Sequence, residues 1–231
     1  MSATQNIIQT IERNKISTTE VGDVLGKTGQ IEGVSALNKG QFAVGEVILI
    51  YAINNSNYEV HRQIADTDLE NKIVYVYNVN CTKAIFGELV SKYILLYKRA
   101  KAIVINGLLR DANNLIKENF PIWLSGVSPI GCVNYPNGDD IDGRLLKQLI
   151  ETYNGSIMVC DDSGVVMIPK HMITEELIKK LNFIEFQEDI WFYCLDTLKM
   201  STFDIVCEKK YLNNNMLDPQ MLNSLKNNTN N

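Results

Sequence analysis

Residues 84–106, AIFGELVSKYILLYKRAKAIVIN, decide the fold of this chain. Apolar residues in their first part recur at steps of three and four, the spacing of a helix with one apolar stripe. A strand is predicted on each side of this helix, at 72–79 (KIVYVYNV) and at 102–106. A strand, a helix and a strand so close together form a βαβ unit, which requires two parallel strands. The apolar positions of the helix are Leu89, Val90, Tyr93, Ile94 and Tyr97.

Local signals predict further elements around this unit. Ser17 stands three residues before Glu20, a capping-box spacing that predicts a helix over 18–26. Residues 41–53 are rich in β-branched and aromatic residues and predict a strand. Two apolar runs within 155–169 are joined by Asp161-Asp162-Ser163-Gly164, which predicts a hairpin. The remaining predictions are a helix at 111–119, a strand at 120–126, and helices at 170–181 and 185–199.

Bulk composition limits the class of protein. A length of 231 residues suits one domain with an appended element. The formal net charge of −5 and the scattered lysines and arginines offer no basic surface, so we expect no direct binding to nucleic acid. No apolar run reaches the roughly 18 residues of a membrane span, and no signal peptide is recognisable. We therefore expect a soluble cytoplasmic protein that does not bind membranes.

The cysteines and histidines exclude several kinds of site. The five cysteines are odd in number, far apart and never in a C-x-x-C pair, which favours buried free thiols over a disulfide framework or a zinc site. The two histidines are too few for a three-histidine zinc site. His61 is expected at the surface or in a satisfied polar contact, and His171 in a solvated capping role at a helix start. A metal bound here would need mostly oxygen ligands, which favours Mg²⁺ or Mn²⁺.

Residues 22–28, GDVLGKT, resemble a phosphate-binding loop but do not match its pattern. Three residues, not four, separate Gly22 from Gly26, and the stretch lies inside a predicted helix instead of following a buried strand. We therefore do not expect ATP to bind at this place.

Arg110 and Asp111 stand side by side where the strand at 102–106 gives way to a helix. Ligands of α/β sheets bind beyond the carboxyl ends of parallel strands, and Gly87 opens the helix that follows the neighbouring strand end. An arginine fork, helix-start amides and a carboxylate that could hold a hard cation suit an anionic substrate. The residues alone leave another interpretation open, in which Asp111 caps its own helix and Arg110 is a surface partner.

The run from 84 to 129 resembles the RraA-like family, which includes divalent-metal pyruvate aldolases. The shared features are a G-E-L turn before a helix, the G-x-x-R-D turn and the following strand, with weaker similarity at 17–29 and at 155–169. The resemblance covers about residues 15–182 and implies a swivelling β/β/α fold that forms trimers or pairs of trimers. We expect an RraA-like domain over 1–182, a helical extension over 183–212 and a loosely held tail over 213–231.

The resemblance also implies roles for individual residues. The turn formed by Gly87, Glu88, Leu89 and Val90 would bind the substrate, with the amides of Leu89 and Val90 holding its pyruvyl carboxylate. Arg110 would neutralise developing negative charge, and Asp111 would ligate Mg²⁺ or Mn²⁺. The aldolases carry a further acid where this chain has Asn114, which could bind the metal only through a water.

The first functional hypothesis is a metal-dependent lyase acting on a 2-oxo acid. Its substrate would be of the 4-hydroxy-4-methyl-2-oxoglutarate type, or oxaloacetate, and pyruvate enolate would be formed in either case. The alternative is a non-catalytic homotrimer or homohexamer that regulates a partner protein such as ribonuclease E. A third possibility is an enzyme for another acid or sugar, specialised by the divergent segment 132–154, which replaces a glycine-rich strand region of the family.

Overall fold

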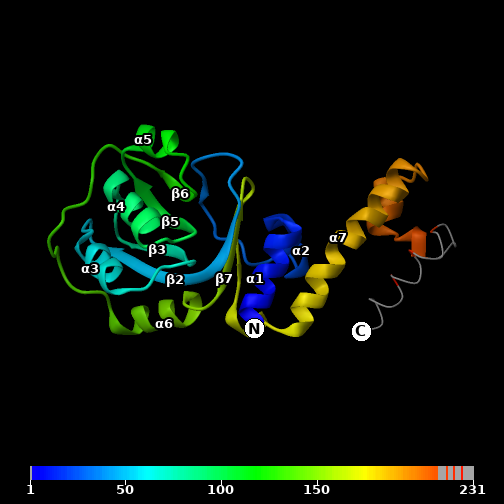
Figure 1. Ribbon diagram of the computed structural model, residues 1–231, viewed down its shortest axis with the longest axis horizontal. Coiled ribbons are helices and arrows are strands. Elements are labelled where there is room, and N and C mark those ends of the chain that lie inside the picture. The colour runs from blue at the N-terminus through cyan, green and yellow to red at the C-terminus, as the bar shows by residue number, and fades with distance from the viewer. Residues whose placement is uncertain (1, 213–216, 218–220, 222–224, 226–231) are drawn as a thin grey trace. The chain divides into compact units, whose positions relative to one another are not determined.

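Figure 1 shows the computed structural model, which describes residues 2–212, 217, 221 and 225. The chain divides into two compact units, Met1–Leu177 and Ile178–Asn231. The first unit contains the sheet, and the described part of the second is helical. The predicted tail at 213–231 falls outside the described residues, apart from positions 217, 221 and 225.

The first unit is built on one mixed sheet. Its strand order is β1-β6-β5-β3-β2-β7-β8, and β4 pairs with β5. The central strands β2, β3, β5 and β6 are parallel, whereas β1 and the β7–β8 hairpin are antiparallel to their neighbours. This arrangement confirms the predicted α/β class, the parallel centre and the hairpin. The strands are β1 Ser35–Ala36, β2 Ala43–Ile53, β3 Ile73–Val79, β4 Ala84–Phe86, β5 Ala102–Leu109, β6 Ile122–Val127, β7 Ile157–Asp161 and β8 Gly164–Ile168.

Helices cover both faces of this sheet. Because successive strand residues point to opposite faces, Val74 and Ile103 pack under α3, α4 and α5, whereas Tyr75 and Val104 face α6 and the hairpin. The helices of this unit are α1 Ala3–Asn14, α2 Thr18–Val24, α3 Tyr58–Asp66, α4 Glu88–Lys92, the π-helical turn η1 Tyr93–Tyr97, α5 Ala112–Lys117, α6 Gly143–Tyr153 and the 3-10 turn η2 Lys170–Met172.

The second unit is helical in its described part. Helix α7 (Glu175–Asp196) begins in the first unit and continues into the second, where it is followed by the π-helical turn η3 (Phe203–Cys207) and the 3-10 turn η4 (Lys210–Leu212). Its apolar side chains surround the buried Tyr211, whose hydroxyl accepts a hydrogen bond from Trp191 Nε1 at 3.1 Å. Across the described residues, no helix combines the length and the apolar character that a membrane crossing requires.

Three predictions about helices need correction. The apolar stripe at 84–101 is not buried as one face, because Leu89 and Tyr97 are exposed while Val90 and Ile94 are buried. The π-helical turn η1 breaks the 3.6-residue period there, so the stripe does not keep one direction. The two helices predicted at 170–181 and 185–199 are the single helix α7, since no glycine or proline interrupts the chain between them. Helices α1 and α6 were not predicted.

Asp161 should be a strong contributor to the stability of the first unit. Its carboxylate accepts hydrogen bonds from the amide and hydroxyl of Thr18 at 2.8 and 2.7 Å, and from the amide of Ser163 at 2.7 Å. Replacing it leaves these donors unpaired, so Asp161→Ala should lower the free energy of unfolding by about 1–3 kcal/mol in urea titrations. Asp162→Ala is the control, because Asp162 accepts one side-chain bond, from the exposed Gly40 amide. Equal losses in both variants would contradict this role.

Candidate functional site

The ends of two parallel strands lie next to each other in the sheet. β4 pairs with β5, and the amide of Arg110 donates a hydrogen bond to the carbonyl of Phe86 at 2.9 Å. Each strand then turns into a helix, β4 into α4 through Gly87 and β5 into α5 through Arg110 and Asp111. The two strand ends therefore share one edge, as the sequence predicted.

The side chain of Asp111 is turned away from its own helix. Asp111 is the N-cap of α5, with a left-handed backbone at φ 60°, but its carboxylate makes no capping bond to that helix. Instead Oδ2 accepts a hydrogen bond from the amide of Glu88 at 3.1 Å and lies 3.6 Å from Arg110 Nε. The interpretation of Asp111 as an ordinary helix cap therefore does not describe this structure.

Two glycines make room for this pair. A Cβ on Gly87 would lie 2.1 Å from Asp111 Oδ2 and 2.7 Å from Arg110 Cγ, closer than any side chain allows. A Cβ on Gly131 would lie 3.0 Å from Arg110 Nη1. The backbone of this chain thus approaches the Arg110 and Asp111 side chains more closely than a larger residue at these two positions would permit.

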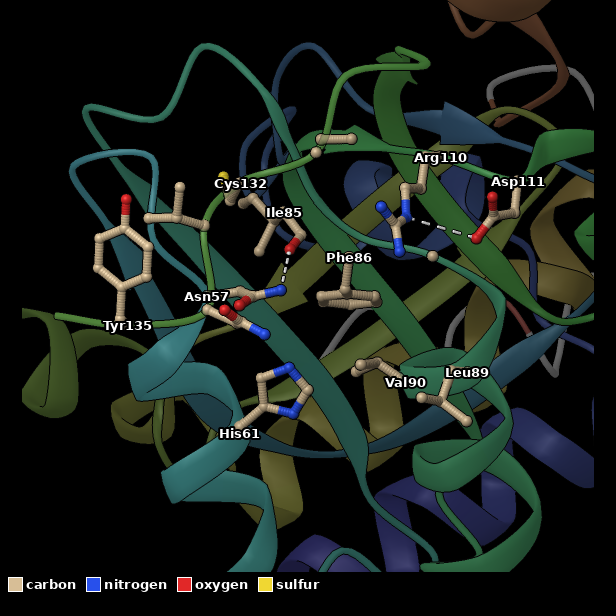
Figure 2. A pocket seen from close by; sticks show the side chains of 15 residues that line it. Asn57, His61, Ile85, Phe86, Leu89, Val90, Arg110, Asp111, Cys132 and Tyr135 are labelled. Atoms are coloured by element: carbon tan, nitrogen blue, oxygen red, sulfur yellow. Dashed lines mark hydrogen bonds and ion pairs between the residues drawn. The ribbon is translucent and has the colours of Figure 1, made fainter. Parts of the chain in front are cut away.

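A cavity of about 390 Å³ opens over these groups, within the size range of small-ligand sites. Gly87, Leu89, Val90, Arg110 and Asp111 all line it, so the structure brings these five predicted site residues together (Figure 2). Leu89 and Val90 stand in the first turn of α4, where backbone amides have no partner within a helix.

Glu88 and Asn114 are placed differently. The side chain of Glu88 accepts a hydrogen bond from Asn114 Nδ2 at 2.6 Å and pairs with Lys92 Nζ at 2.8 Å. Lys92, followed by Asn114, lowers the pKa of the Glu88 carboxyl. Neither residue lines the cavity, although Asn114 borders an adjoining hollow that Asp111 also lines. Glu88 thus contributes its amide to Asp111, and its own carboxylate is engaged elsewhere.

Two residues that the sequence analysis did not select also line the cavity. Figure 2 shows the His61 ring on the far side of Phe86 from Arg110, with Asn57 next to it. Asn57 Nδ2 donates to the carbonyl of Ile85 at 2.9 Å, while its Oδ1 is buried and has no partner among the described residues. Their positions in the sequence could have indicated them, because both residues come after the end of strand β2, just as Arg110 comes after the end of β5.

The residues at this site fit a lightly held divalent cation. Nowhere in the described part of the chain do three His, Cys, Asp or Glu side chains gather as metal ligands. Mg²⁺, however, usually keeps several waters and needs only one or two carboxylates together with oxygen atoms of its substrate. The Asp111 side chain is 41% exposed, and its Oδ1 has no hydrogen-bond partner among the described residues. Asp111 can therefore supply one carboxylate ligand, and the other ligands would be water and substrate.

Two sequence relatives span much of this chain. A Halalkalibacterium halodurans protein named "Putative 4-hydroxy-4-methyl-2-oxoglutarate aldolase" is 26% identical over 159 residues, which are 67% of this chain and 73% of that protein. Protein DlpA of Legionella pneumophila is 21% identical over 194 residues, or 78% of this chain. The chain spans only 30% of the length of DlpA, so the two proteins correspond in one part.

A solved structure has a similar fold, and a protein-family model matches most of this chain. RraAS2 of Streptomyces coelicolor, described as an unusual member of the RNase ES inhibitor RraA protein family, superimposes with a TM-score of 0.63 at 19% identity, covering 79% of this chain and 94% of that one. The family described as "RraA-like: Aldolase/RraA" matches residues 18–167, which include every strand and turn that lines the cavity up to Tyr135. Since this match covers well over half of its length, the chain belongs to the RraA-like family.

Proposed function

We propose that this protein is a divalent-metal-dependent lyase that releases pyruvate from a 2-oxo acid. The substrate would be of the 4-hydroxy-4-methyl-2-oxoglutarate type, or oxaloacetate. The observation that carries the proposal is the orientation of Asp111, which lies across Gly87 and beside Arg110 in the cavity instead of capping α5. The relative named for the same aldolase activity supports it.

The residues divide the work according to their chemistry. The first-turn amides of Leu89 and Val90 bind the carboxylate of the pyruvyl half, since they are donors at the positive end of a helix. Arg110 stabilises the negative charge that develops on the pyruvyl oxygen as the carbon–carbon bond breaks. Asp111 would hold the Mg²⁺ or Mn²⁺, which when bound would polarise the keto oxygen of the substrate.

The cavity also has room for the other half of the substrate. His61 and Asn57 lie on the side away from Asp111, as Figure 2 shows, and both carry polar atoms that can meet a hydroxyl or a second carboxylate. Asn57 Oδ1 is a buried acceptor without a partner in the described chain, so a donor on the substrate would satisfy it. A branched hydroxy acid suits these groups better than a purely apolar chain.

The test is pyruvate release from 4-hydroxy-4-methyl-2-oxoglutarate and from oxaloacetate, with Mg²⁺ or Mn²⁺ and then with EDTA. Oxaloacetate also needs a sample with metal and no protein, because only protein-dependent turnover counts. Activity that EDTA removes and that added metal restores is the expected result. Turnover no faster than in the sample without protein, for both substrates, would refute the proposal.

Replacing Arg110 even by lysine should lower the activity. Arginine presents a planar fork, whereas lysine offers a compact point charge on a flexible stem, so Arg110→Lys keeps the charge but loses the geometry. We expect kcat/KM for pyruvate release to fall by at least about tenfold, equivalent to about 1.4 kcal/mol of transition-state stabilisation. Arg144→Lys, at an exposed position of α6, is the matched control and should change nothing. Full activity in Arg110→Lys would exclude Arg110 from this role.

A surface near the site supports self-association. Exposed apolar side chains gather on α4 and η1, namely Leu89, Tyr93, Leu96 and Tyr97. Clusters of this kind usually mark contacts with other molecules. We therefore propose that the protein is a homotrimer or homohexamer in which this surface is covered by another copy.

The second candidate function is regulation of a partner protein such as ribonuclease E. Two observations favour it, namely Asn114 in place of an acid and the structural similarity to an RNase ES inhibitor family member. Capture of ribonuclease E by the wild type and equally by Asp111→Ala, without pyruvate release by either, would favour this function over the lyase.

A further inference from the structure

Two cysteines from distant parts of the chain meet beside the cavity. Cys81 follows strand β3, and Cys132 lies in the segment after β6 that lines the cavity. Asn55 connects the two places, because its amide donates to Cys81 Sγ at 3.3 Å and its carbonyl accepts from the Val133 amide at 2.9 Å. Asn55 therefore contacts the Cys81 thiol directly and the backbone of the residue that follows Cys132.

Further hydrogen bonds fix each cysteine. The Cys81 amide donates to Asn78 Oδ1 at 2.6 Å. The Cys132 amide donates to the Ala84 carbonyl at 2.8 Å, and its thiol lies 3.8 Å from the Lys83 carbonyl. Both side chains belong to the same apolar cluster on the α3–α5 side of the sheet. These backbone hydrogen bonds and the shared apolar cluster fix the positions of both cysteines in the fold.

The contact between the thiols changes their chemistry. Hydrogen bonding with the Cys132 side chain lowers the pKa of Cys81 to about 7, and the Asn55 amide adds to this effect. The same interaction, together with burial, raises the pKa of Cys132 well above its ordinary value. Near pH 7 about half of Cys81 is therefore the nucleophilic thiolate, next to a protonated Cys132, the arrangement of an attacking and a resolving cysteine.

Access distinguishes this pair from the other cysteines. Cys132 is half-buried at the cavity wall, and Cys81 is buried but keeps 8% of its surface exposed, whereas Cys160 and Cys194 have none. Cys160 and Cys194 are buried, and burial raises the pKa of both thiols. Cys207 is exposed and lies in η3, in the second unit, whereas Cys81 and Cys132 belong to the first.

We propose that Cys81 and Cys132 form a dithiol site that hydrogen peroxide oxidises to an intramolecular disulfide. The Cys81 thiolate attacks one peroxide oxygen, the O–O bond breaks, and the departing hydroxide takes a proton to become water. The Cys132 sulfur then attacks the resulting sulfenic sulfur of Cys81, the S–O bond breaks, and a second water leaves with the Cys132 proton. Two electrons pass from the thiols to the peroxide, and one S–S bond forms.

Formation of this disulfide would change the part of the cavity wall that contains Cys132. An S–S bond of about 2.05 Å is much shorter than a contact between unbonded sulfur atoms, so the segments that carry Cys81 and Cys132 must approach each other. Gly131, the preceding residue, packs against Arg110. Oxidation therefore reaches the same segment that confines the Arg110 guanidinium.

Peptide mapping of the whole protein tests the proposal directly. After treatment with hydrogen peroxide and blocking of free thiols, trypsin should release residues 73–83 linked to residues 118–144, and dithiothreitol should separate them. Sulfenic or sulfinic acid on single cysteines with no linked pair would overturn the proposal. Cross-links to Cys207 in the same yield would overturn it equally, because they would mean unselective oxidation.

The rate of Cys81 alkylation by iodoacetamide at pH 7 is an independent readout. Cys132→Ala removes the hydrogen bond with Cys81, so the thiolate fraction of Cys81 should fall from about one half to about 3%, while the higher basicity restores about fivefold in nucleophilicity. The net expectation is alkylation about threefold slower, with no change in Cys207→Ser as control. An unchanged rate in Cys132→Ala would overturn the proposed pairing. Neither readout uses a 2-oxo acid, so failure here is distinct from failure of the lyase proposal.

Discussion

Asp111→Ala should lower metal-dependent pyruvate release by at least about 100-fold, the largest effect of any single substitution in this chain. The substitution removes the only carboxylate among the described residues that line the cavity, and with it the proposed protein ligand for the divalent cation. Steady-state assays of pyruvate release with saturating Mn²⁺ measure the loss. The fold should remain, because the Asp111 side chain makes no bond to its own helix.

Asp111→Asn sharpens this test. Asparagine keeps the shape and can still accept the hydrogen bond from the Glu88 amide, but it lacks the negative charge that a hard cation prefers. We expect a loss similar to that in Asp111→Ala. Asp162→Ala, which removes a carboxylate from a turn far along the chain, serves as the control and should retain full activity. Wild-type turnover in Asp111→Asn would show that the charge is not used.

Gly87→Ala should be nearly as damaging, although it adds only one methyl group. The new Cβ would lie 2.1 Å from Asp111 Oδ2 and 2.7 Å from Arg110 Cγ, so both side chains must move. A displacement of about 1 Å at reacting groups can cost about 100-fold in rate, and we expect a loss of that order in kcat/KM. Pyruvate release, measured beside thermal unfolding, separates this effect from misfolding.

Gly22→Ala is the matched control for this substitution. Gly22 lies inside α2, and nothing lies within 4 Å of a Cβ placed there. Alanine is the better helix former, so this variant should keep its activity and gain about 0.5–1 kcal/mol of stability. Equal activity in Gly87→Ala and Gly22→Ala would mean that the close approach of Gly87 to Asp111 has no function.

Much of the fold could be predicted because its signals are local. The βαβ unit follows from apolar periodicity between 72 and 106, and the rule that such a unit needs parallel strands places Gly87 and Arg110 at one edge. The hairpin follows from the turn at Asp161–Gly164. These predictions succeed because short-range spacing and chain connectivity decide them.

Other features depend on contacts that spacing does not reveal. The turn of Asp111 toward Glu88 rests on a left-handed backbone and on the missing side chain of Gly87, which no periodicity indicates. His61 was expected at the surface or in a satisfied polar contact, and it is indeed exposed, but spacing did not reveal that it also lines the cavity, where α3 begins at the same sheet edge. The approach of Cys132 to Cys81 requires the return of the chain after β6, and the separation of these cysteines in sequence hides it.

The structure also supports a proposal for the domain organisation of the chain. We propose that residues 1–182 carry the RraA-like activity, since the cavity and the family match lie within them. Residues 183–212, which have an apolar cluster of their own around Tyr211, are proposed as a helical extension. The site can be assayed in the whole chain, with this extension present.

The central claim is that Asp111, Arg110 and the amides after Gly87 together seat a chelated 2-oxo acid. Crystals of the full chain soaked with Mn²⁺ and oxalate, a stable mimic of the pyruvate enolate, test it most directly by anomalous scattering. The account predicts one manganese peak bonded to a carboxylate oxygen of Asp111, with oxalate between that ion, Arg110 and the amides of Leu89 and Val90. A manganese peak only at another place in the chain would contradict it. So would crystals with neither manganese at Asp111 nor oxalate in the cavity.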